Sequence, residues 1–163
     1  MITIEKKSLK VGEYVDTKHV DEVIRTYKQE RWVHNSKRIG KEDSLSGWYS
    51  VEELEEFIET IKDHGADGIR FYFGAYPENH APKPEYAGRQ TMVLVATKSK
   101  ETESGTKHKD VYVTKGGDTT IMAYNLINLC PPYCSGFSSQ AKSDFVNVGL
   151  TIIDKGDEGM AVV

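Results

Sequence analysis

The feature that most constrains this fold is a capped amphipathic helix that is followed almost at once by an alternating strand. Ser50 and Glu53 have the spacing of a capping box, in which each side chain binds the other residue's backbone N–H. Gly65 can adopt the left-handed conformation that ends a helix. The pattern predicts a helix over 50–64, whose apolar stripe packs on a core and consists of Leu54, Phe57, Ile58 and Ile61.

The next apolar segments read as strands. In residues 68–76, alternate side chains point to opposite faces, with Ile69, Phe71, Phe73 and Ala75 on one face and Arg70, Tyr72, Gly74 and Tyr76 on the other. Residues 90–97 are apolar on both faces, which is typical of a central strand covered on both sides. A third strand is predicted over about 109–114.

The remaining segments are less patterned. Residues 98–109 are polar and predict a mobile loop, and residues 115–118 predict a turn. Residues 121–129 fit either a strand or a helix. An earlier helix is predicted over about 17–33, with an apolar stripe of Val20, Val23, Ile24 and Tyr27.

Because elements of one type run together, the order favours an α+β fold, with two helices packed on a mostly antiparallel sheet of three to five strands. We expect one domain over residues 1–134. Residues 135–163 form a Ser- and Gly-rich tail, for which we expect partial disorder and one strand at 148–153.

Composition excludes several classes of protein. The 163 residues are 38% hydrophobic and 28% charged, which indicates a globular chain. No apolar run approaches the roughly 20 residues of a membrane-spanning helix, and the first residues lack the order of a signal peptide. We therefore expect a soluble, cytoplasmic protein with no membrane insertion.

Cys130 and Cys134 flank the sequence Pro-Pro-Tyr. Two thiols at this spacing can stay reduced, form a disulfide or bind one soft metal ion. A closed zinc site needs four ligands, and none of the five histidines forms a pair at zinc-finger spacing. We expect no cofactor, and zinc at the two cysteines is the minor alternative.

Two segments are candidates for binding a ligand or a partner. Arg70, Tyr72 and Tyr76 share one strand face, where an arginine beside phenols can bind an anion or form a structural ion pair. The loop over 77–89 is stiffened by three prolines. Prolines lower the ordering cost of recognition, so this loop is a candidate surface through His80, Tyr86 and Arg89.

Nucleic acid is an unlikely partner. The first predicted helix and the residues after it are basic, with Arg25, Lys28, Arg31, Lys37, Arg38 and Lys41. However, the whole chain has a net charge of −4, whereas general nucleic-acid binders have a basic excess. A solvated helix face explains these charges as well.

Three stretches together resemble a group of small uncharacterised bacterial proteins. They are WYSVEEL at 48–54, GIRFYFGAYP at 68–77 and LCPPYC at 129–134. The resemblance covers about residues 45–135 and implies a shared fold unit but no substrate. It singles out Arg70, Tyr72, Gly74, Tyr76, Pro77, Cys130 and Cys134 as positions of interest.

The sequence has no nucleophile elbow, P-loop, dinucleotide-binding glycine pattern or HExxH motif. The pattern therefore favours a small non-enzymatic module that binds a protein partner or a small ligand, with homo-oligomer formation left open. The alternative is a metal- or thiol-dependent sensor or enzyme centred on Cys130 and Cys134.

Overall fold

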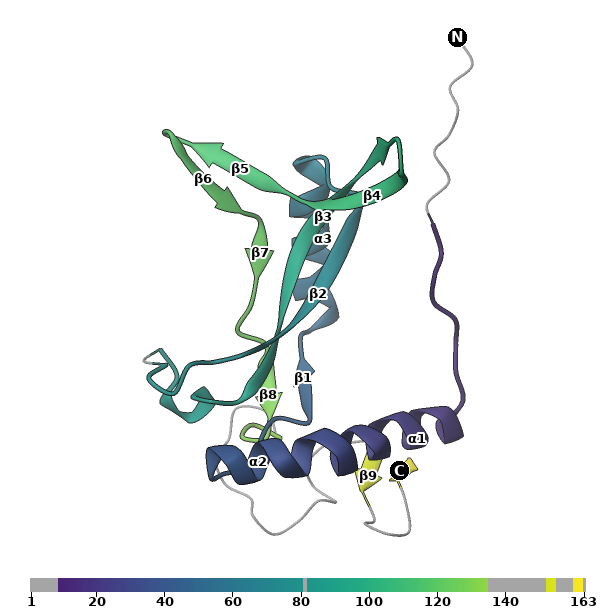
Figure 1. Cartoon of the computed structure of the whole chain (residues 1–163), viewed down its shortest axis with the longest axis vertical. Helices are drawn as coiled ribbons and strands as arrows, with labels where there is room; N and C mark the ends of the chain where they lie inside the picture. The colour runs from purple at the N-terminus through teal and green to yellow at the C-terminus, as the bar shows by residue number, and fades with distance from the viewer. Residues whose placement is uncertain (1–8, 81, 135–151, 155–159, 163) are drawn as a thin grey trace.

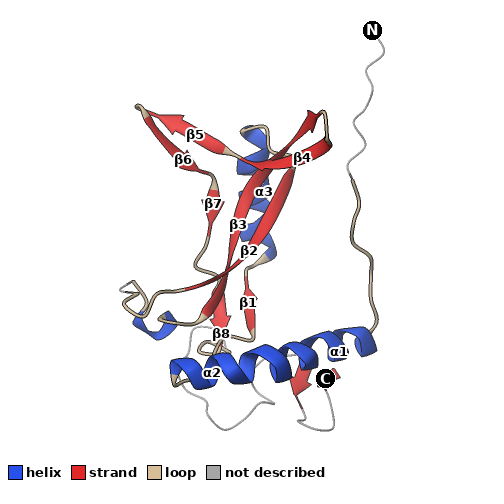
Figure 2. Cartoon of the chain, viewed as in Figure 1, coloured by secondary structure: helices blue, strands red, loops and turns tan. Residues whose placement is uncertain are grey.

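The computed structural model of the chain describes residues 9–80, 82–134, 152–154 and 160–162. It confirms the α+β class, because two helical units accompany several antiparallel sheets, the largest of four strands. Figures 1 and 2 show the first helical unit lying across one end of a long strand pair. Within the described residues, no helix has the length and apolar character needed to cross a bilayer.

The first helical unit is longer than the sequence predicts. α1 (Thr17–Tyr27) continues through a π-helical stretch (Lys28–Trp32) into α2 (Val33–Ile39). The Asp16 carboxylate accepts the N–H of His19 and caps its start. Gly40, with a φ of +71°, ends it in the left-handed conformation that favours glycine. The unit therefore covers 17–39 rather than 17–33.

The capped helix is confirmed as α3 (Val51–Asp63), which follows the short strand β1 (Ser46–Trp48). The Ser50 hydroxyl accepts the N–H of Glu53 at 3.1 Å, which is one half of the predicted capping box, whereas the Glu53 carboxylate accepts the Tyr124 hydroxyl. Phe57 and Ile61 of α3 are buried against Leu94 and Ala96 of the sheet. This contact forms the main core.

The main sheet is built around β3 (Gln90–Thr102), which pairs with β2 (Gly68–Ala75), β4 (Gly105–Asp110) and β7 (Ala123–Tyr124). The central position predicted for residues 90–97 is confirmed. In the β2–β3 register, Ile69, Phe71 and Phe73 stand opposite Ala96, Leu94 and Met92. These six residues share the face of the sheet on which α3 packs, which we call the helix face.

The loop predicted over 98–109 is wrong. Residues 97–102 of β3 pair with residues 105–110 of β4. The side chains of this ribbon are polar, so no apolar alternation marks the strands, and cross-strand pairing decides the conformation instead. The strand predicted at 109–114 is divided between the end of β4 and β5 (Tyr112–Lys115).

Shorter strands complete the structure. β5 pairs with β6 (Asp118–Ile121) across the predicted turn, where Gly116 and Gly117 have positive φ. Of the two alternatives for 121–129, the strand is confirmed by β7 and by β8 (Asn128–Cys130), which pairs with β1. β9 (Ile152–Asp154) pairs with β10 (Met160–Val162), so the predicted tail strand is present at 152–153, and residues 148–151 lie outside the described residues.

A short segment after α2 joins the first helical unit to the end of the sheet. The Trp32 indole N–H donates to the Asp43 carbonyl at 2.7 Å. The Asp43 N–H donates to the Ser36 hydroxyl at 2.9 Å, and the Ser44 hydroxyl donates to the Gln90 carbonyl of β3. These bonds hold the helix beside the end of β3 and define the space between them.

Candidate functional site

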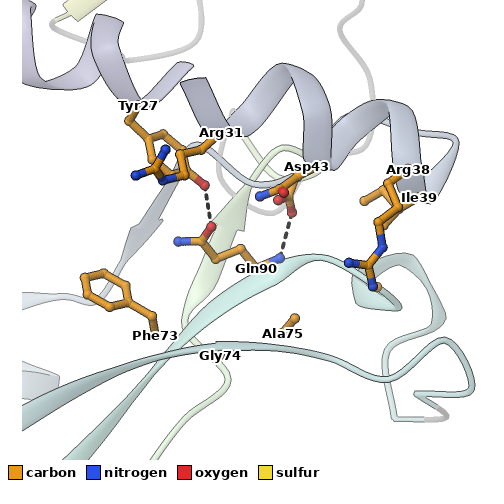
Figure 3. A pocket seen from close by; sticks show the side chains of 11 residues that line it. Tyr27, Arg31, Arg38, Ile39, Asp43, Phe73, Gly74, Ala75 and Gln90 are labelled. Carbon is orange, nitrogen blue, oxygen red and sulfur yellow. Dashed lines mark hydrogen bonds between the residues drawn. The ribbon is translucent and has the colours of Figure 1, made fainter. Parts of the chain in front are cut away.

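A cleft of about 620 Å³ lies between the first helical unit and the ends of β2 and β3. Figure 3 shows helix residues on one side and the strand pair on the other. The volume is within the range of small-molecule sites. The cleft is lined by Tyr27, Arg31, Asn35, Arg38, Ile39, Asp43, Phe73, Gly74, Ala75, Gly88 and Gln90.

The helix wall carries two arginines, Arg31 and Arg38. Within the part of the chain that the structure describes, Arg31 makes a single 3.5 Å hydrogen bond to the Glu30 carbonyl, and neither arginine forms an ion pair. In Figure 3 the Arg38 guanidinium extends from the helix towards the strand pair. Because Arg31 and Arg38 are seven positions apart, they lie about two turns from each other on the same side of the first helical unit.

The polar centre of the cleft is Gln90. Its side-chain oxygen accepts the Tyr27 hydroxyl, and in Figure 3 its amide nitrogen points away from Tyr27. That nitrogen has no hydrogen-bond partner among the residues described. An amide nitrogen can only donate, so the cleft offers this donor in addition to the two guanidinium groups.

Asp43 is the one acidic residue in the lining, and its carboxylate is already occupied. The residue is 2% exposed, and its Oδ1 accepts the N–H of Ser44 at 2.8 Å and the N–H of Gln90 at 2.6 Å. Burial and the charge of Asp43 raise the pKa of Tyr27, while the charge of Arg31 opposes the shift. Tyr27 therefore stays a neutral hydroxyl in the cleft at physiological pH.

The part of the cleft wall that β2 forms is apolar. Phe73 is 78% exposed although it stands on the helix face of β2, and Gly74 and Ala75 follow it. Since Gly74 has no side chain, the backbone of β2 is accessible there. The cleft thus combines cationic donors on the helix with an aromatic surface on the strand.

The predicted residues Arg70 and Tyr72 lie on the opposite face of β2, outside this cleft. Arg70 forms an ion pair with Asp110 at 2.5 Å and donates to the His108 carbonyl. Tyr72 donates to the same carboxylate at 2.7 Å. Among the described residues, Asp110 therefore already supplies the anion that this pair was predicted to bind.

Tyr76 and His80 are brought together in the loop region. Their rings stack with centroids 4.3 Å apart, and Tyr76 donates to the Asn125 side chain at 2.8 Å. The His80 Nε2 atom is buried and has no hydrogen-bond partner among the described residues. Both residues pack against the body of the protein.

Tyr86 and Arg89 are buried in the structure, with exposures of 0% and 8%. The Tyr86 hydroxyl accepts the Leu129 N–H, and Arg89 donates to the carbonyls of Glu85 and Glu42. Burial lowers the pKa of Arg89, and the charges of Asp43 and Glu42 oppose this shift. These bonds hold the proline-rich loop on the protein, so a partner can reach the two side chains only if the loop moves.

Cys130 and Cys134 form a disulfide with a Cα–Cα distance of 4.6 Å. Tyr133, between them, packs its ring against Tyr86 and donates to the Glu85 carboxylate. Over the described residues, no group of three or more His, Cys, Asp and Glu side chains is arranged to hold a metal ion.

The cleft residues are the ones that sequence reasoning missed. Arg31 and Arg38 belong to the basic stretch, which we interpreted as a solvated face. Their spacing of seven is the signal that could have placed them on one face. Phe73 belongs to an alternating strand, and the alternation assigns it to the apolar face without showing what lies against that face. Nothing in the sequence shows that these segments meet.

Comparisons with protein-family models, curated proteins and solved structures find no match for the chain. The resemblance to a bacterial group therefore stays a prediction, and the functional argument depends on the cleft itself.

Proposed function

We propose that the protein is a non-enzymatic binding module whose cleft takes a small organic anion with an aromatic part. The observation that carries the proposal is that Arg31 and Arg38, unpaired within the described residues, line the same cleft as the exposed ring of Phe73. A cytoplasmic location is part of this proposal.

The residues suit the two parts of such a ligand differently. The guanidinium groups and the Gln90 amide can donate to a carboxylate or a phosphate, and hydrogen bonds to charged groups contribute about 1.5–3 kcal/mol each. Phe73 offers its ring to the apolar part, where aromatic contacts add about 0.5–1.5 kcal/mol. The Asp43 carboxylate is held by two backbone N–H groups, which limits its repulsion of the anion.

The proposal is tested with phenyl phosphate as the probe, titrated into the full chain and followed by amide NMR shifts. We expect shifts that cluster at the cleft and millimolar affinity. Inorganic phosphate, which lacks the ring, and benzyl alcohol, which lacks the charge, should each bind more weakly.

Matched variants identify the contacts. Arg31→Ala and Arg38→Ala each remove a guanidinium group that can donate a hydrogen bond to the phosphate. We expect each variant to bind phenyl phosphate about tenfold more weakly or worse. Lys37→Ala removes the same charge beside the cleft and should change the affinity less than about twofold. Equal losses in Lys37→Ala and Arg38→Ala would mean non-specific attraction and would refute the proposal.

A second candidate is a thiol-dependent sensor, which the Cys130–Cys134 disulfide favours. A sensor requires that reduction changes an output. We would therefore compare the phenyl phosphate affinity of the oxidised protein with that of the reduced protein and of Cys134→Ser. An affinity that is the same in all three forms would reject the sensor while leaving the binding module intact.

A further inference from the structure

Among the described residues, β2 is an edge strand that is paired on one side. It is hydrogen-bonded to β3 on one side, and no other backbone group in the described part of the chain bonds residues 68–75. Figure 2 shows β2 at the margin of the main sheet. Such an edge presents a row of unpaired N–H and C=O groups to a further strand.

The register shows which groups are free. The Ala96 N–H donates to the Met122 carbonyl, on the side of β3 that faces away from β2. Ile69 stands opposite Ala96 in the β2–β3 ladder. Opposite residues of an antiparallel pair either bond to each other or both point away from each other. Because Ala96 bonds away from β2, the backbone N–H and C=O of Ile69 point away from β3. By the same alternation, the backbone groups of residues 69, 71, 73 and 75 point to the open edge.

This edge lacks the features that normally prevent pairing. Residues 68–75 contain no proline and no lysine, and their one charge, Arg70, is neutralised by Asp110. Instead the strand exposes Phe71 by 52% and Phe73 by 78%. An exposed, apolar edge of eight residues is suited to pairing with another strand.

We infer that β2 pairs with β2 of a second copy of this chain, antiparallel about a two-fold axis at Tyr72. This register places Phe71 opposite Phe73 of the second copy, and Ile69 opposite its Ala75. The backbone N–H and C=O groups of all these residues point to the open edge of β2, as pairing with a second strand requires. A register shifted to centre on Arg70 would set two arginines against each other, which opposes it.

The pairing would also extend the cleft. Phe73 and Ala75 line the cleft from the edge of the sheet. Opposite them, the second copy places its Phe71 and Ile69 on the same face of the joined sheet. The second copy thus contributes apolar side chains beside the open side of the cleft. The inference itself stands on the edge strand and does not depend on anion binding.

Amide hydrogen exchange of the wild-type chain tests the inference without a substitution. At about 1 mM protein, where a dimer is populated, we expect the amides of Phe71 and Phe73 to exchange at least tenfold more slowly than at about 10 μM. The amide of Tyr72, which faces β3, is the internal control and should not depend on concentration. Sedimentation should show a dimer at the higher concentration.

Variants separate this edge from other surfaces. Phe71→Lys should raise the dimer dissociation constant at least tenfold, whereas Tyr112→Lys, at an exposed aromatic of β5, should leave it unchanged. Circular dichroism checks that both variants fold. A monomer at both concentrations would overturn the inference, as would a dimer with unprotected edge amides. Protection that is equal at all concentrations would also overturn it and would mean that another part of the same chain covers the edge.

Discussion

At the scale of single residues, Tyr86 joins the proline-rich loop to β8. Its hydroxyl accepts the N–H of Leu129, and both residues are buried. In Tyr86→Phe this N–H would lose its partner, which costs about 1–3 kcal/mol for a buried donor. We expect urea unfolding to show a loss of that size. Tyr14→Phe, at a fully exposed tyrosine, should change the unfolding free energy by less than about 0.5 kcal/mol.

Tyr133 and Glu85 give the stability a defined dependence on pH. The Tyr133 hydroxyl donates to the Glu85 carboxylate, which lowers the pKa of Glu85 and raises the pKa of Tyr133 to about 12. The lowered pKa of Glu85 stabilises the folded state above its usual value of 4.5, and this contribution disappears as the pH falls. The raised pKa of Tyr133 stabilises it below 10, and this contribution disappears as the pH rises towards 12.

We therefore expect the unfolding free energy of the wild type to exceed that of Tyr133→Phe by a constant amount between about pH 5 and pH 9.5. The difference should shrink below and above this range. Urea titrations of both proteins at a series of pH values measure it. A difference that stays the same at the extremes would show that the hydrogen bond is not its source.

At the scale of elements, the N-terminus of α3 depends on one hydroxyl. Ser50→Ala removes the acceptor of the Glu53 N–H and should cost about 1 kcal/mol, and Ser50→Asp should restore most of it. Ser46→Ala, at an exposed position in β1, serves as the control. Equal unfolding midpoints for Ser50→Ala and the wild type would contradict the assigned cap.

α3 and β4 show which elements a sequence can reveal. α3 was predicted because its cap, its stripe and its final glycine agree within one short segment. β4 was missed because residues such as Lys107 and Lys109 are exposed, and only their partners on β3 give them a strand conformation. Local signals therefore identified the helix, whereas long-range pairing determined the strand.

At the scale of the whole molecule, the disulfide closes a small ring at the end of β8. The chain-entropy model gives about 2 kcal/mol for a ring with a sequence separation of 4. We expect the double variant Cys130→Ser/Cys134→Ser to lose about this much unfolding free energy. Adding a reductant should lower the unfolding free energy of the wild type by the same amount and leave that of the double variant unchanged. A wild type that is insensitive to reductant would argue against a structural disulfide.

The cleft is a property of the whole molecule, and this is why the sequence did not reveal it. Arg38, Phe73 and Gln90 come from a helix and from two strands. Their meeting depends on the bonds that Asp43 and Ser44 make to the helix and to β3. The fold class, by contrast, follows from the type and order of the elements, which periodicity shows. Tyr86 and Arg89 were predicted as a binding surface because their loop is stiff, but in the structure both side chains are buried.

The bond from Trp32 to the Asp43 carbonyl also gives the protein its own optical reporter. The chain has two tryptophans, and the other one, Trp48, is 59% exposed on β1. In a Trp48→Phe variant, all indole emission would come from Trp32, which lies where the first helical unit is held beside the end of β3. We call this contact the joint. If the helix moved away from β3, the indole would become hydrated and its emission would shift to longer wavelength. Opening of the joint could then be followed in real time, without a label.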